Sequence, residues 1–243
     1  GQWAGTLQAL NLEAGEATSL SFLAGLQQLS TLAVEATLPE PGFERLAISR
    51  LQKLHCLKWA MYGEKEPGDE AEQQPLVLPP SLLHLDIFAA YSLQTVERQQ
   101  PALRRLQSLK VDFSDPTPTF LAAICSLSSL TYLHLGDCEL ASLPPQLSSL
   151  TALVCLILCN NGFGATVQGA ASLRVLGHLP QLEYLDLHNC QLSGQRLLPA
   201  CAPPRLRVLD IGDNGCVLPA SWLLRLQRLA CDWEQVRAYE ICC

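Results

Sequence analysis

The chain has 243 residues, of which 49% are hydrophobic, and this is enough to bury a large core. Its net charge of -7 argues against nucleic acid as a main partner, because phosphate binding needs a basic surface. The longest apolar run, 152–159, has eight residues. A membrane-spanning helix needs roughly 18, so we expect no membrane span.

Ten short segments along the chain repeat one pattern, in which Leu-x-x-Leu is followed after one residue by a third apolar residue. On a strand, the last two apolar residues of each copy point one way and their neighbours point the other way. The pattern therefore predicts ten strands that bury their apolar faces by stacking in parallel. The first leucines of the copies are Leu7, Leu29, Leu54, Leu82, Leu106, Leu130, Leu153, Leu182, Leu206 and Leu226.

Successive copies are 20 to 29 residues apart, and the clearest ones share a further position after the strand. There, an Asn can satisfy backbone groups that the turn would otherwise leave buried and unpaired. A Cys can fill the same buried corner as a small, weakly polar residue. This position is occupied by Cys138, Asn161, Cys190 and Asn214.

Together, these features resemble the leucine-rich-repeat family over essentially the whole chain, most strongly from 127 to 214. The resemblance implies an α/β fold, a solenoid in which the chain forms a curved right-handed coil. Its parallel sheet would lie on the concave face, and short helices and turns on the convex face. We expect a single domain over residues 1–243 with about ten repeats, and because the chain begins at Gly1 we expect it to be a fragment of a longer protein.

The segments between the predicted strands differ in character. Residues 120–127 and 167–179 have the apolar spacing of helices. Residues 143–147 are short and Pro-rich, and 140–150 resembles the LxxLPxxLxxL subtype common in intracellular members of the family. Residues 63–77 form an acidic insertion, which we interpret as a solvated loop, with an acidic contact loop as the alternative.

The eleven cysteines bear on the cellular compartment. Their number is odd, they lack CxxC spacing, and most lie inside the repeats, whereas an extracellular domain would pair them at its caps. We therefore expect an intracellular, cytoplasmic protein, with the cytoskeleton or the flagellar axoneme as more specific locations. An extracellular location is the weaker alternative.

A thiol or metal enzyme is the least favoured function. Cys155 and Cys159 should face outward from one strand, with His134 one strand away from Cys155. A thiol–imidazole pair is conceivable there, but the sequence supplies neither an oxyanion hole nor a third, orienting group. We expect no enzyme activity, no metal and no cofactor, and we assign Cys138 and Cys190 a structural role.

The outward-facing strand residues provide the functional signal. Exposed aromatic side chains mixed with charges are typical of a protein-binding face, and the excess of acids favours a partner with a basic segment. We predict a non-catalytic protein–protein interaction scaffold, for example in signalling, with the ligand-binding ectodomain of a cell-surface receptor as the alternative. The predicted binding residues are Phe88, Lys110, Asp112, Phe113, Tyr132, His134, Asp137, Tyr184, Asp186, His188, Asp210 and Asp213.

Overall fold

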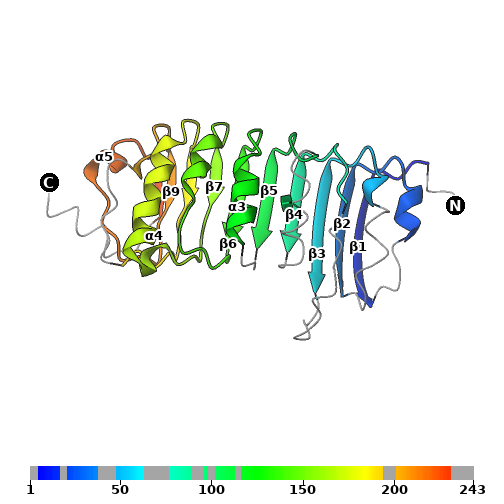
Figure 1. Ribbon diagram of the computed structural model, residues 1–243, viewed down its shortest axis with the longest axis horizontal. Coiled ribbons are helices and arrows are strands. Elements are labelled where there is room, and N and C mark those ends of the chain that lie inside the picture. The colour runs from blue at the N-terminus through cyan, green and yellow to red at the C-terminus, as the bar shows by residue number, and fades with distance from the viewer. Residues whose placement is uncertain are drawn as a thin grey trace.

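The computed structural model describes residues 5–16, 21–37, 48–62, 77–88, 96–97, 102–112, 116–193 and 201–230. Within these ranges, ten strands form one sheet in chain order, and every neighbouring pair is parallel. They lie side by side along the long axis of the molecule (Figure 1). The strands are β1 (Ala9–Glu16), β2 (Thr31–Thr37), β3 (Cys56–Tyr62), β4 (His84–Phe88), β5 (Ser108–Asp112), β6 (Tyr132–Gly136), β7 (Cys155–Ile157), β8 (Tyr184–Asp186), β9 (Val208–Asp210) and β10 (Arg228–Ala230).

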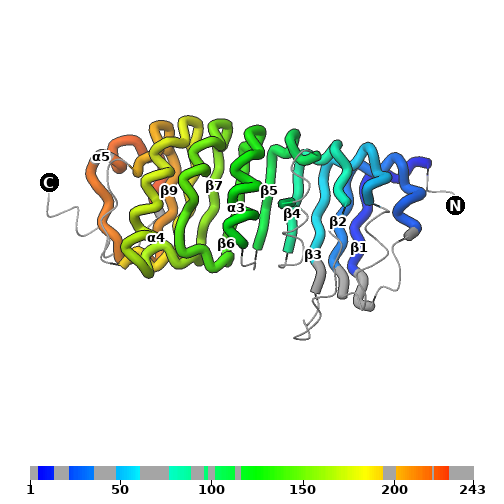
Figure 2. Tube along the Cα trace, viewed as in Figure 1, coloured from blue at the N-terminus to red at the C-terminus, as the bar shows by residue number. Residues whose placement is uncertain are grey.

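The register of the sheet confirms the predicted strand alignment. Each copy of the leucine pattern contributes one strand, and the second leucines face one another across the whole sheet, from Leu10 to Leu229. Chain neighbours are therefore spatial neighbours, and the colour in Figure 2 passes in order from blue to red along the molecule. On β7, for example, Leu156 is fully buried, whereas Ile157 on the other face is half-buried.

Short helices cover the core side of the sheet, and Figure 1 shows α3 and α4 passing in front of the strands. The helix predicted over 120–127 is present as α3 (Pro118–Cys125), which begins where the Thr117 hydroxyl accepts a hydrogen bond from the Phe120 N–H. The other helical segments are α4 (Val167–Ser172), α5 (Ala220–Leu223) and the 3-10 turns η1 (Ser21–Gly25), η3 (Pro145–Ser149), η4 (Phe163–Ala165) and η5 (Leu173–His178).

The helix predicted over 167–179 forms in part. It begins at Val167, but it is α-helical only to Ser172 and continues as the 3-10 turn η5. Gly177 and Pro180, at the end of this segment, disfavour a longer α-helix. The Pro-rich segment predicted to be short is the single 3-10 turn η3. The acidic insertion lies outside the described residues except for Val77.

The predicted Asn and Cys position closes the turn after β6, β7, β8 and β9, where it is occupied by Cys138, Asn161, Cys190 and Asn214. Asn161, which is 2% exposed, donates hydrogen bonds to the Leu135, Leu158 and Cys159 carbonyls and accepts one from the Leu140 N–H. Asn214, which lies two repeats further along the chain, makes equivalent hydrogen bonds. The Cys138 thiol donates to the Gly136 and Val111 carbonyls. These buried bonds tie the four turns to the preceding repeats, which agrees with the structural role assigned to Cys138 and Cys190.

Candidate functional site: the open face of the sheet

We define the open face as the side of the sheet that carries the strand residues alternating with the core leucines. These side chains form rows across the strands, because the register keeps equivalent positions opposite one another. One row runs through Lys58, Asp86, Lys110, His134 and Ile157 and continues as Asp186 and Asp210. Parallel strands lie about 4.8 Å apart, so neighbours in a row are within interaction distance.

Most of the predicted binding residues lie on this face or in the turns at its edge. The strands carry Phe88, Lys110, Asp112, Tyr132, His134, Tyr184, Asp186 and Asp210, and the turns carry Asp137, His188 and Asp213. Asp213 is exposed and the others are half-buried. Phe113 lies outside the described residues. Their role in binding remains a prediction.

Three of these residues form a charge cluster over β5 and β6. Lys110 Nζ lies 2.6 Å from Asp112 Oδ2, and His134 Nε2 lies 2.7 Å from Asp112 Oδ1. Burial by itself would raise the pKa of Asp112, but the hydrogen bonds from His134 and Lys110 outweigh it and lower that pKa. Burial would likewise lower the pKa of Lys110, and Asp112 reverses this and raises it. The positive charge of Lys110 therefore offsets the negative charge of Asp112 within the cluster.

A second cluster over β8 and β9 is acidic. Asp186 and Asp210 face each other across neighbouring strands. Burial is the main reason why the pKa of Asp186 is raised, and the charge of Asp210 adds to it, although the His188 N–H donates to the Asp186 carboxylate at 2.8 Å. His188 Nε2 lies 3.1 Å from Asp213 Oδ2, at the edge of the face. The carboxylates of Asp186 and Asp210 are thus held side by side. The neighbouring His188 imidazole is closer to Asp213 than to Asp210.

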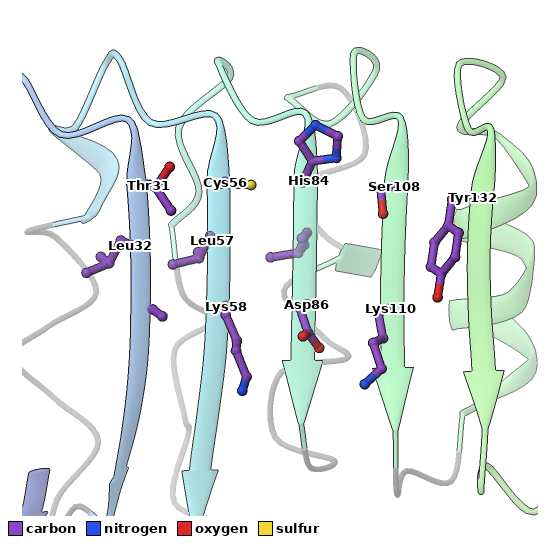
Figure 3. A pocket seen from close by; sticks show the side chains of 12 residues that line it. Thr31, Leu32, Cys56, Leu57, Lys58, His84, Asp86, Ser108, Lys110 and Tyr132 are labelled. Atoms are coloured by element: carbon purple, nitrogen blue, oxygen red, sulfur yellow. The ribbon is translucent and has the colours of Figure 1, made fainter. Parts of the chain in front are cut away.

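A shallow hollow of about 270 Å³ lies on the open face over β2–β6 (Figure 3). Its floor is apolar because the outward residues there are small, including Ala33, Cys56 and Ser108, and leave the leucine rows partly uncovered. Figure 3 shows Lys58, Asp86, Lys110 and Tyr132 around it. Pockets for whole small molecules are usually larger, at about 300–1,000 Å³, so this hollow has the size for one or two side chains.

Lys58 and Asp86 were missed as candidate site residues. Lys58 is exposed and Asp86 is half-buried, and both occupy the same row as Lys110. Burial raises the pKa of Asp86, although Lys110 opposes this. The alternation of each strand pattern places both residues outward, so extending the row to the weaker copies would have found them.

His134 lies one strand from Cys155, as expected, but its imidazole is paired with Asp112. Tyr132, not His134, lies opposite Cys155. Burial, followed by the nearby Asp186 charge, raises the pKa of the Cys155 thiol to about 11, so little of it is a reactive thiolate at neutral pH. Within the described ranges, no group of three or more His, Cys, Asp or Glu side chains could hold a metal ion.

Comparisons with known proteins agree with this architecture. The family model described as Leucine Rich Repeat matches residues 129–150 and 181–201. Residues 129–150 and 181–201 therefore carry repeats of the leucine-rich-repeat family. The fold is an α/β solenoid of this family, with the ten described parallel strands in one open sheet. No curated protein sequence matches the chain.

Two solved structures illustrate the likeness. An internalin (inlF) from Listeria monocytogenes superimposes with a TM-score of 0.55 at 16% identity, over 88% of this chain and 66% of its own. The Arabidopsis receptor kinase HAESA, in complex with the peptide hormone IDA and the co-receptor SERK1, gives a TM-score of 0.60 at 21% identity, over 93% of this chain and 38% of its own. This chain thus spans less than two thirds of each of these proteins, and identities this low show the fold alone.

Leucine-rich-repeat proteins generally act as non-catalytic scaffolds for protein–protein interaction. In the part of the chain that the structure describes, no helix is long and apolar enough to cross a bilayer.

Proposed function

We propose that this leucine-rich-repeat protein is a non-catalytic scaffold inside the cell that binds a partner protein on the open face of its sheet. The observation that carries the proposal is the composition of that face: half-buried aromatic side chains stand among charges over β4–β9. Aromatic side chains provide large contact areas at little entropic cost, and they are enriched at binding hot spots.

The charges indicate the chemistry of the partner. The acidic cluster and the net charge of -7 favour a partner with a basic segment. The thiols of Cys56, Cys125, Cys155, Cys159 and Cys190 are free, which fits a reducing compartment.

A ligand-binding ectodomain of a cell-surface receptor is the second candidate. The likeness to the receptor kinase HAESA, whose structure contains a peptide hormone, favours it. A thiol count in denaturant without reductant distinguishes the two, because several disulfides would favour the ectodomain.

The test of the binding face uses a partner isolated by affinity capture and then purified. Tyr132→Ala combined with Tyr184→Ala should weaken binding by at least about 2 kcal/mol, because hot-spot aromatics carry truncation costs of that size. Both side chains point away from the core, so the melting temperature should change little. Binding kinetics of the wild type and the double variant measure the effect.

The same binding experiment also tests the acidic cluster. Asp210→Lys with Asp213→Lys should slow association with a basic partner, and added salt should reduce this difference. If both double variants bind with the affinity of the wild type, the open face is not the binding site.

A further inference from the structure

The open face offers two unlike contact sites joined by an apolar strip. The first is the hollow over β2–β6, with its apolar floor. The second is the carboxylate pair Asp186 and Asp210 on β8 and β9. Tyr132 lies at the β6 edge of the hollow, and Cys155 and Ile157 on β7 lie between the two sites; all three are half-buried and uncharged at neutral pH. The compensated cluster around Asp112 borders this strip and needs no counter-charge from a partner.

We propose that the open face binds an extended segment of a partner protein that places an apolar side chain in the hollow and a Lys or Arg side chain between Asp186 and Asp210. This inference rests on the proposed function and specifies its ligand. The hollow has the size for a side chain such as leucine, and an apolar floor favours an apolar occupant. A cation between the two carboxylates would relieve their mutual repulsion, because the His188 imidazole lies 3.8 Å from Asp210 and is closer, at 3.1 Å, to Asp213.

The sheet geometry fixes the spacing of the two groups. The hollow centres on β4, and the carboxylate pair lies four to five strands further along the sheet. At about 4.8 Å per strand this is about 19–24 Å. An extended segment rises about 3.3 Å per residue, so the apolar and basic side chains should be about six or seven residues apart.

Two synthetic peptides test the spacing. The first, acetyl-Leu-Thr-Thr-Ser-Thr-Thr-Arg-amide, separates Leu and Arg by six positions; the second has the same composition, with Arg directly after Leu. Each peptide is made with its sequence in both directions and carries a fluorescent label. Its affinity for the whole 243-residue protein is measured by fluorescence anisotropy. We expect one direction of the spaced peptide to bind at least about tenfold more tightly than the adjacent one, a difference of about 1.4 kcal/mol. Equal affinities, or no binding by either peptide, would overturn the inference.

Matched variants test the two contact sites. Ala33→Leu should fill the hollow and abolish the advantage of the spaced peptide, whereas Asn11→Leu, at the equivalent outward position on β1, should not. Asp186→Asn with Asp210→Asn should weaken the spaced peptide but not a version with Gln in place of Arg. Glu183→Gln, which removes an acid paired with Arg207, is the control. One outcome is that the hollow and carboxylate variants leave peptide binding unchanged while the double tyrosine variant still weakens binding of the isolated partner protein. In that case this inference fails and the proposed function stands.

Discussion

The buried asparagines show how single side chains hold the repeats together. Asn161 bonds to backbone groups of its own turn and of the preceding repeat. Asn161→Ala would leave several of these groups buried and unpaired, so we expect it to lower the free energy of unfolding by about 3 kcal/mol. Cys138→Ala removes only a weak thiol donor from the equivalent place and should cost about 1 kcal/mol. Denaturant unfolding of both variants measures the difference; equal losses would contradict this account.

The repeat pattern predicted the buried Asn or Cys position, but it did not predict the backbone conformation of the residue before it. Asp137, Asn160, Asn189 and Asp213 directly precede the Asn or Cys position and have φ values of 52, 56, 49 and 53°. Asp and Asn tolerate this left-handed conformation better than most residues. Their side chains also form a ladder, in which Asn189 donates to Asn160 and Asn160 to Asp137. The recurrence of Asp and Asn at one position was the available signal.

At the scale of elements, the sequence predicted strands better than helices. A strand needs only its alternation, and stacking against identical copies sets the register, so even the weak copy at Leu106 was placed correctly. The return segments vary in length and make contacts specific to each repeat. The change from α4 to η5 at Leu173 could therefore not be inferred from apolar spacing.

Two glycines, Gly162 at the start of η4 and Gly164 within it, test how closely the return segments pack. A Cβ on Gly164 would lie 1.8 Å from the Gln191 carbonyl oxygen, so backbone would have to move, whereas a Cβ on Gly162 would meet nothing nearer than 3.7 Å. We expect Gly164→Ala to lower stability by about 3 kcal/mol and Gly162→Ala to change it by less than about 0.5 kcal/mol. Thermal and denaturant unfolding of the pair measure this; similar melting temperatures would show that the repeats can slide apart here.

For the whole molecule, the sequence indicated which residues face outward but not how their charges combine. Lys110, Asp112 and His134 were all predicted to lie on the binding face, yet Lys110 and His134 both pair with Asp112. Asp186 and Asp210 were predicted there too, and they repel. The difference depends on which strands are neighbours and on how far each carboxylate is buried, and both follow from the assembled sheet.

These two environments should give opposite responses to pH. The lowered pKa of Asp112 means that its charge stabilises the fold above the unfolded-state pKa, and this contribution is lost as the pH falls through that value toward the folded-state pKa. The raised pKa of Asp186 means that its charge opposes folding at neutral pH, and stability is gained as the pH falls through the folded-state pKa. Asp112→Asn should therefore lower the melting temperature at pH 7, and Asp186→Asn should raise it. Both differences should shrink at acidic pH, where the wild-type carboxyls become protonated.

Melting curves of the wild type and both variants between pH 3 and pH 7 measure these effects, with Glu183→Gln as a control for the loss of one charge. A lower melting temperature for Asp186→Asn at pH 7 would show that the Asp186 charge stabilises the fold. A higher melting temperature for Asp186→Asn, combined with weaker binding of the spaced peptide, would show that Asp186 serves binding at the expense of stability. The Asp186 carboxylate would then reduce the stability of the free protein and favour the complex by attracting a basic side chain of the partner to the open face.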